Sequence, residues 1–177
     1  MIKLRFPTDK DIKEIDSVCN AKWALDFGFT HFWESRLLQD AKALIRFLPL
    51  MQKGEELQGT EVACSFLFAF NEENKIVGRA SIRHEVNDDL MKDGGHIGYA
   101  VVPQFRNQGI ATDILKQSLQ FCREWKIQVD GKVLVTCDDD NVGSIKTIEK
   151  NGGTLLDKID LIPGNGKPLK RRYWIGL

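Results

Sequence analysis

The residues with the most specific chemistry form one segment, residues 106–112, which joins a predicted strand to a predicted helix. They are, in order, Arg106, Asn107, Gln108, Gly109, Ile110, Ala111 and Thr112. The small residues Gly109 and Ala111 leave room for backbone N–H groups to come close to a bound anion. The N-terminus of the following helix favours negative charge at the same point. The segment therefore predicts a binding loop for a phosphate group.

Two other phosphate-binding patterns do not match this segment. A P-loop needs Gly-Lys-Ser or Gly-Lys-Thr, and the segment contains neither. A dinucleotide fingerprint needs three glycines and an acidic residue after the next strand, and only part of that pattern is present. A glycine that opens a helix can also act only in a turn or in packing. The segment by itself leaves both functions open.

Strand and helix patterns alternate along the chain that positions this segment. The composition of short runs predicts strands at residues 2–6, 62–70, 75–85, 96–102, 132–137, 154–162 and 171–177. Apolar residues at helical spacing predict helices at residues 12–19, 41–51, 109–125 and 141–151. Residues 71–74 are typical of a hairpin turn, and the last two strands are expected to pair. No repeat or linker divides the chain, which predicts one domain over residues 1–177.

Two stretches have weaker patterns. Residues 86–95 are expected to form a polar loop. Residues 21–60 contain an aromatic cluster that could be core or could border a substrate pocket: Trp23, Phe27, Phe29, Phe32 and Trp33.

Composition narrows the class of protein. The 25 basic and 25 acidic residues give a formal net charge of zero, which disfavours nucleic acid and anionic membranes as partners. The start of the chain lacks the apolar core of a signal peptide, and no apolar run is long enough to cross a bilayer. The four cysteines have no CxxC spacing, which favours reduced thiols in the cytoplasm. The histidines and cysteines do not cluster at metal-ligand spacing, so we expect no metal.

With its surroundings, the segment resembles a motif of the GCN5-related N-acetyltransferase (GNAT) superfamily. Residues 106–111 match the pattern Gln/Arg-x-x-Gly-x-Gly/Ala, and they follow a Val-x-Pro strand end. Downstream, Asn141-x-x-Ser144 followed by Gly152-Gly153 resembles the second motif of the family. The order of elements agrees as well, so the resemblance covers roughly residues 1–177 and is weakest over 21–60.

The resemblance implies a fold and a donor molecule. The fold is α/β (α+β) with three layers: a central mixed, mostly antiparallel sheet, splayed between its fourth and fifth strands and flanked by helices. The donor is acetyl-CoA, whose pyrophosphate would bind the backbone of residues 106–112. Its pantetheine arm would pair with the backbone of Val101 and Val102, while Asn141 and Ser144 would lie on its other side.

The implied reaction is acetylation of a primary amine by direct transfer in a ternary complex, because no cysteine lies in a recognisable nucleophile arrangement. An amine with a pKa near ~10.4 must lose a proton before it attacks. His96, near the start of the fourth strand, and Glu85, beside His84, are the candidate bases. The alternatives are that His96 only hydrogen-bonds a loop and that Glu85 is a solvated strand end.

The acid is unassigned from the sequence. Many relatives carry a tyrosine seven residues after the asparagine of the second motif, and this chain has Ile148 there. Tyr99 on the fourth strand could supply a proton or belong to the core, and water could serve instead. The missing tyrosine leaves a second function open: a module that binds or senses acyl-CoA without turnover.

Charged segments near the end of the chain have two interpretations each. Residues 138–140, three aspartates, could attract a cationic acceptor or form a polar loop before the helix cap. The basic residues Lys167, Lys170, Arg171 and Arg172 could meet nucleic acid, but a solvated hairpin loop is favoured. A homodimer is an expectation that no motif tests.

Overall fold

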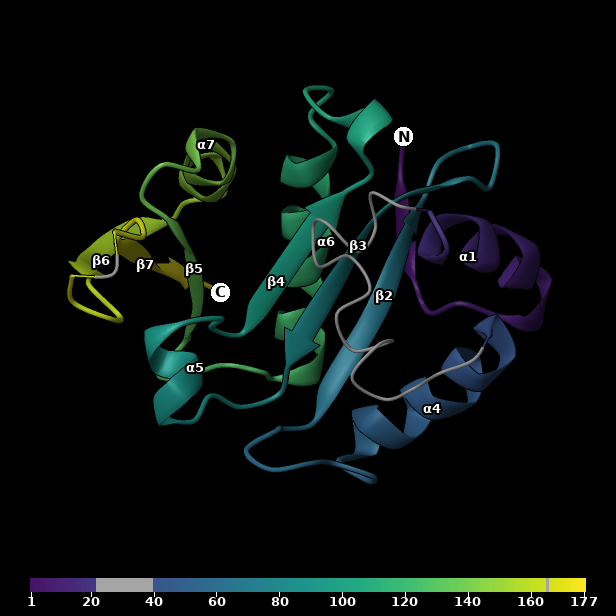
Figure 1. Ribbon diagram of the computed structural model, residues 1–177, viewed down its shortest axis with the longest axis horizontal. Coiled ribbons are helices and arrows are strands. Elements are labelled where there is room, and N and C mark those ends of the chain that lie inside the picture. Colours follow the sequence, from purple (N-terminus) through teal and green to yellow (C-terminus); the bar gives the residue numbers. More distant parts are fainter. Residues whose placement is uncertain (22–39, 165) are drawn as a thin grey trace.

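The strands form two antiparallel sheets in the computed structural model, which describes residues 1–21, 40–164 and 166–177 (Figure 1). The first sheet has the order β1-β2-β3-β4, and its strands are β1 (Lys3–Arg5), β2 (Cys64–Phe70), β3 (Ile76–Arg83) and β4 (Ile97–Val101). The second has the order β5-β7-β6, and its strands are β5 (Lys132–Asp138), β7 (Lys170–Gly176) and β6 (Thr154–Ile159). Every ladder within these sheets is antiparallel.

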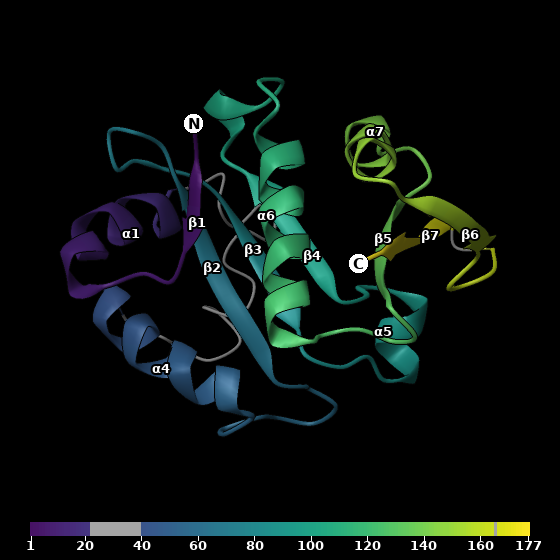
Figure 2. The ribbon, with the colours of Figure 1, turned by 180° about the vertical axis from the view of Figure 1, so that it is seen from behind.

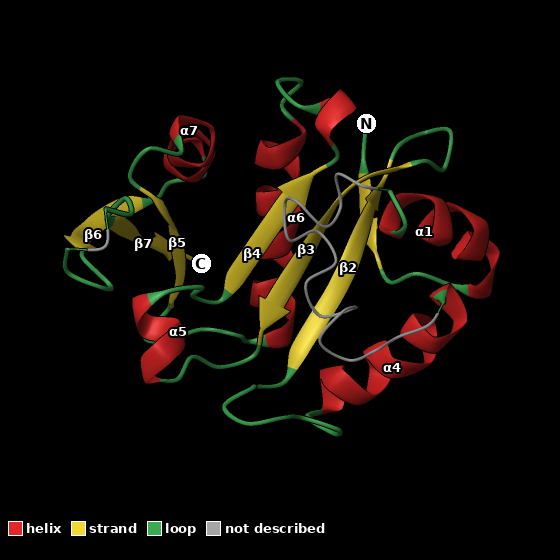
Figure 3. Ribbon diagram, viewed as in Figure 1, coloured by secondary structure: helices red, strands yellow, loops and turns green. Residues whose placement is uncertain are grey.

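Helices cover both faces of the first sheet, as Figures 1 and 2 show from opposite sides. The helices of the described residues are α1 (Ile12–Cys19), α4 (Ala41–Lys53), α5 (Asp88–Lys92), α6 (Ile110–Trp125) and α7 (Val142–Lys150), with short 3₁₀ turns at Asp9–Asp11 and Pro103–Phe105. Helices α1 and α4 lie on one face and α6 lies on the other, while α7 lies beside the second sheet (Figure 3). The three-layer arrangement expected from the sequence is confirmed.

The alternation of side chains along β2 explains the two layers of core. Phe66, Phe68 and Phe70 point to one face and pack in the cluster that contains Ile15 of α1 and Leu44 of α4. The intervening Leu67 packs on the opposite face with Leu115 of α6, and Ala69 lies there with Ile114. Because successive residues point to opposite faces, a central strand covered on both sides is apolar throughout.

The sheets meet at β4 and β5, yet these two strands share no ladder. A pair of hydrogen bonds joins the chain just before β4 to β5: the His96 N–H donates to the Leu134 carbonyl at 2.7 Å, and the Leu134 N–H donates to His96 Nδ1 at 2.9 Å. Beyond this point the strands separate (Figure 1). The splayed cleft implied by the resemblance is therefore present.

Gly95 allows this close approach. Its φ of +58° lies in the left-handed region, and a Cβ there would overlap the carbonyl group of Leu134 on β5. The Gly95 N–H donates to the Leu90 carbonyl at 2.9 Å, which ties the turn to α5. Both the backbone conformation and the lack of a side chain are needed where the two sheets meet.

Most element predictions are confirmed, with small shifts at the ends. The strand expected at 75–85 ends at Arg83, and the strand expected at 154–162 ends at Ile159. The expected polar loop 86–95 contains helix α5, which Asn87 caps by accepting the Leu90 N–H. This short helix has no buried residue, so no apolar stripe could reveal it in the sequence. The aromatic cluster at 23–33 lies outside the described residues.

No helix of the described residues combines the length and apolar character that crossing a bilayer requires.

Substitution of Gly95 by alanine is expected to lower the free energy of unfolding by about 3 kcal/mol, because backbone strain and steric overlap add. The matched control is Gly131→Ala, which has a φ of +73° but no backbone atom close to a new Cβ. It should cost only about 1 kcal/mol. Chemical denaturation of both variants measures the difference. Equal losses would contradict a special role for the contact between Gly95 and Leu134.

Candidate functional site

Two cavities lie along the cleft that opens between β4 and β5. The larger, of about 580 Å³, lies at the N-terminus of α6, and the smaller, of about 280 Å³, lies between β3, β4 and β5. Three residues line both cavities: Tyr99, Asn141 and Ser144. We call these three residues the junction. A molecule in one cavity can therefore meet a molecule in the other at this point.

The loop before α6 forms one wall of the larger cavity. Gly109 caps the helix with a φ of +79°, and no atom lies within 4 Å of a Cβ built there, so it is the backbone conformation that favours glycine. The helix N-terminus leaves the N–H groups of residues 110–112 without intrahelical acceptors, and all three residues line the cavity. These free donors and the helix dipole make this wall suited to an anion.

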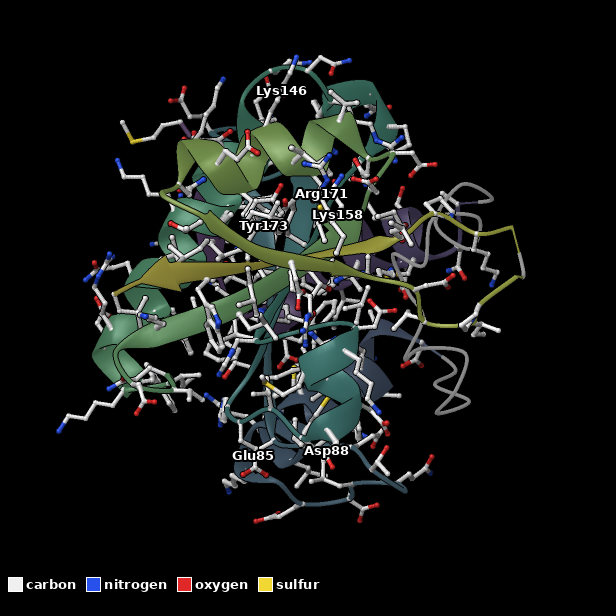
Figure 4. All side chains as sticks on the ribbon, turned by 90° about the vertical axis from the view of Figure 1, so that its left-hand side faces the viewer. Glu85, Asp88, Lys146, Lys158, Arg171 and Tyr173 are labelled. Atoms are coloured by element: carbon white, nitrogen blue, oxygen red, sulfur yellow. The ribbon has the colours of Figure 1, made fainter. Side chains whose placement is uncertain are left out.

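Positive side chains surround the same cavity. Arg106, Lys146 and Lys150 line it, and no aspartate or glutamate is among its described lining residues. Lys146 and Lys150 are four residues apart on α7, so they lie on one side of the helix, where their like charges repel. Figure 4 shows Lys146 on α7 at the upper edge of the molecule. These two lysines were not predicted from the sequence, although their i, i+4 spacing on the expected helix indicates that they lie on one side of it.

Most of the residues predicted to bind acetyl-CoA come together here. Those that line the larger cavity are Val101, Arg106, Asn107, Gly109, Ile110, Ala111, Thr112, Asn141 and Ser144. Gln108 does not line it, and its Nε2 donates to the Gln104 carbonyl at 3.3 Å. Val102 is buried, and its N–H donates to the Val77 carbonyl at 3.0 Å. Of Val101 and Val102, the two residues predicted to pair with the pantetheine arm, only Val101 therefore lies next to the cavity.

A hydrogen bond between Tyr99 and Ser144 lies at the junction. The Tyr99 hydroxyl is 2.7 Å from Ser144 Oγ, and Asn141 Oδ1 accepts the Ser144 N–H at 3.0 Å, which caps α7. Burial raises the pKa of Tyr99 to about 12, although the bond to Ser144 acts in the opposite direction. The hydroxyl therefore keeps its proton at neutral pH. Ile148, where relatives carry a tyrosine, is fully buried in the core.

Charged residues from four elements line the smaller cavity. Arg79 and Arg83 come from β3, Asp138 from β5, Lys170 from β7, and Asp93 from the end of α5. Lys170 lies between the two carboxylates, 3.1 Å from Asp93 and 2.8 Å from Asp138. Burial lowers the pKa of Lys170, but the two carboxylates more than offset this, and the pKa is raised.

Arg171 and Arg172, which follow Lys170 on β7, also form ion pairs. Arg171 pairs with Asp139, which also binds Lys158 at 2.9 Å, and Arg172 pairs with Asp157. Figure 4 shows Lys158 and Arg171 next to each other near α7. In these ion pairs the positive charges of Lys158, Arg171 and Arg172 are matched by the carboxylates of Asp139 and Asp157.

Neither candidate base lines either cavity. His96 is fully buried, and its Nδ1 accepts the Leu134 N–H. Burial, together with the nearby charge of Arg83, lowers the pKa of His96 to about 4. Glu85 is exposed in the bend after β3 and lies at the opposite end of the view from Lys146 in Figure 4. The catalytic role of both residues stays a prediction.

Comparisons with known proteins agree with this geometry. A family model described as an acetyltransferase (GNAT) domain matches residues 2–154. The acetyltransferase of GNAT family from Streptococcus pneumoniae is 16% identical with a TM-score of 0.63, and the match covers 98% of this chain and 98% of that chain. The ribosomal-protein-S5-alanine acetyltransferase from Vibrio fischeri is 15% identical with a TM-score of 0.64, covering 99% and 92%.

A third solved structure contains a bound donor. It is the microcin C7 self-immunity acetyltransferase MccE in complex with acetyl-CoA and AMP, which is 19% identical with a TM-score of 0.64, covering 99% of this chain and 92% of that chain. No curated protein sequence matches the chain. At these identities the structural matches establish a shared fold.

The buried His96 is expected to make stability depend on pH. Its folded-state pKa of about 4 lies below the usual histidine pKa of 6.5, so the unfolded chain alone takes up this proton between those pH values. The free energy of unfolding should therefore fall by up to about 3 kcal/mol as pH decreases through that window. His96→Asn keeps an acceptor for Leu134 and removes the titration, so its stability should vary less with pH.

Denaturation of wild type and variant at several pH values measures this effect. The control is His84→Asn, at a partly buried histidine that is 2.9 Å from Ser65 Oγ. An unchanged pH dependence in His96→Asn would show that His96 does not resist protonation in the folded state.

Proposed function

The chain belongs to the GNAT acetyltransferase family, and from this premise we propose that it transfers the acetyl group of acetyl-CoA to a primary amine by direct transfer in a ternary complex. Residues 1–177 act as one N-acetyltransferase domain in this proposal. The observation that carries it is the pair of cavities that meet at Tyr99, Asn141 and Ser144. One cavity suits an anionic donor, and the other leads to the same point from the side of β3.

The chemistry of the larger cavity supports coenzyme A as its ligand. Its free N–H groups at residues 110–112 and its three cations match the phosphate groups, and the open space at Gly109 lets a phosphate approach the backbone. The Val101 carbonyl faces the open edge of β4, where it accepts from Arg106 Nε at 3.2 Å. This edge is where a pantetheine arm can pair with the strand.

The smaller cavity holds the acceptor in this proposal. The Vibrio fischeri relative is named as an alanine acetyltransferase of a ribosomal protein, which supports an amine as acceptor. Acetyl-CoA supplies an activated thioester carbonyl. The neutral amine attacks that carbon, the C–N bond forms, the C–S bond breaks, and the departing sulfur takes up a proton.

The amine must first lose a proton to a base. His96 and Glu85 remain the residues predicted from the sequence. Asp93 and Asp138 are the carboxylates among the described lining residues of the smaller cavity, and they are placed to attract an ammonium group. If His96→Asn and Glu85→Gln both keep the wild-type kcat at neutral pH, neither residue is the base.

The Tyr99 hydroxyl stabilises the leaving thiolate in this proposal. Because it stays protonated and lies between the cavities, it can donate a hydrogen bond to the developing negative charge. Ser144 orients the hydroxyl from the neighbouring helix. In this proposal Tyr99 and Ser144 stabilise the leaving thiolate in place of the tyrosine that many relatives carry at the position of Ile148.

The two lysines on α7 provide a test of the donor site. We expect Lys146→Gln and Lys150→Gln each to weaken binding of acetyl-CoA about three- to tenfold, because each removes a partly screened charge. Acetyl-pantetheine carries no phosphate group, so the lysine substitutions should not change its affinity. Lys116→Gln, at an exposed lysine on α6 that lines neither cavity, is the control. Calorimetry measures all four proteins, and equal losses for both donors would contradict the assignment.

Replacement of Tyr99 by phenylalanine tests the role of its hydroxyl. We expect kcat to fall about 10- to 100-fold with little change in acetyl-CoA affinity, because a hydrogen bond to a charge is lost in the reaction. The control is Tyr173→Phe, at a buried tyrosine that lines neither cavity. Release of free thiol gives the rates, and an unchanged kcat in Tyr99→Phe would remove Tyr99 from the mechanism.

The alternative function is a sensing module that binds acyl-CoA without turnover, which the buried Ile148 keeps open. Calorimetry with acetyl-CoA and thiol release with a panel of amines separate the two functions. Binding without thiol release for any amine favours the sensor. Absence of acetyl-CoA binding would contradict both.

A further inference from the structure

Two guanidinium groups form the floor of the smaller cavity. Arg79 and Arg83 are four residues apart on β3, so they project from the same face of the strand. Both approach Gly98 on β4: a Cβ built there would lie 3.9 Å from Arg79 Nη1 and 3.7 Å from Arg83 Nη1. The same Cβ would lie 2.9 Å from Ser81 Oγ, so the lack of a side chain at Gly98 lets Ser81 and both arginines lie close to the strand.

The Arg83 guanidinium is held in place by backbone. Its Nη1 donates to the carbonyls of Gly94 and Gly95, at 3.2 Å each. No ion pair joins Arg83 to a carboxylate of the described part of the chain. The turn that joins the two sheets therefore also orients a cation toward the cavity.

The two positive charges are close enough to affect each other. Burial, together with the charge of Arg83, lowers the pKa of Arg79 to about 10, so both groups are still positive at neutral pH. An anion bound in the cavity that both arginines line would be attracted by their positive charges. Planar guanidinium groups match carboxylate and phosphate oxygens in geometry.

We propose that the acceptor is an amine that also carries an oxyanion, a carboxylate or a phosphate, and that this group binds at Arg79 and Arg83. The inference rests on the proposed function and assigns a substrate class to its acceptor site. The anion lies on the floor beside Gly98, and the amine points to the junction at Tyr99.

The smaller cavity limits the size of such an acceptor. Consecutive side chains of a strand point to opposite faces, so the arginines beside Gly98 and the Tyr99 hydroxyl lie on opposite sides of β4, and the acceptor reaches from one to the other past the open edge of the strand. Both groups line the same cavity of about 280 Å³, which an acceptor with a short link between its nitrogen and its anionic group can occupy. Small amino acids and aminoalkyl phosphates meet this requirement. A polyamine would place a second cation against Arg79 and Arg83, which costs Coulomb energy.

Matched acceptor pairs test the inference. Thiol release is measured for an amino acid against its amide, for aminoethyl phosphate against ethanolamine, and for spermidine. We expect the anionic member of at least one pair to have a kcat/KM about 10- to 100-fold above its neutral partner, as for a hydrogen bond to a charged group. The two pairs separate a carboxylate from a phosphate.

Variants of Arg83 connect the preference to the site. Arg83→Gln should remove most of the preference for the anionic member while the KM for acetyl-CoA stays unchanged, and Arg83→Lys should keep part of it. Arg123→Gln, at an exposed arginine on α6 that lines neither cavity, is the control. An unchanged far-UV circular dichroism spectrum and unchanged acetyl-CoA binding show that Arg83→Gln is folded. If Arg83→Gln does not fold, Arg83→Lys is compared with wild type. A smaller preference for the anionic acceptor in Arg83→Lys supports the inference, and an unchanged preference contradicts it.

Two results would overturn the inference and leave the proposed function intact. One is acetylation of neutral amines or spermidine with a kcat/KM equal to or above that of the anionic acceptors. The other is an anionic preference that Arg83→Gln does not change. Acetyl-CoA binding without thiol release from any amine would contradict the proposed function, and the inference with it.

Discussion

The pair of hydrogen bonds between His96 and Leu134 is the constraint on which the rest of the structure depends. It brings β4 and β5 together at one end of each strand, and no ladder continues the contact. A full ladder would use the strand edges that now line the cleft, and loss of the contact would separate the two sheets. Gly95 makes the approach possible because a side chain there would overlap Leu134. A buried imidazole takes the place of a backbone acceptor and keeps its neutral form at physiological pH.

The other side of the cleft is held by helices. Asn151, just after α7, donates from Nδ2 to the Thr112 carbonyl in the first turn of α6 at 3.2 Å. The lysines of α7 and the N-terminus of α6 therefore face one cavity. On the side of β3, the turn at Gly94 and Gly95 orients Arg83 toward the smaller cavity. The contact that joins the two sheets and the contact that orients a charge for the acceptor thus both involve residues 94–96.

Much of the fold could be predicted because its signals are local. The hydrophobic stripe of α6, the cap at Asn141 and the β-rich composition of β2 each depend on residues a few positions apart, and these elements appear as expected. Helix α5 was missed because it buries no side chain and depends only on its cap. The part of the larger cavity that the loop and the α6 N-terminus form could also be predicted, since it is one continuous segment, whereas Lys146 and Lys150 come from a separate helix and were missed. The exceptions, Gln108 and Val102, point away because of contacts with Gln104 and Val77 that no local pattern reveals.

The sequence by itself determined the strand-loop-helix segment at 106–112, the family resemblance and the absence of a tyrosine at Ile148, because each is a property of neighbouring residues. Only the tertiary structure decided which side chains share a cavity, because those residues lie far apart along the chain. It brought Tyr99 to Ser144, placed Arg79 and Arg83 beside β4, and buried His96 between the sheets. Burial and neighbouring charge then set the protonation of these groups, and neither quantity exists before the chain is folded.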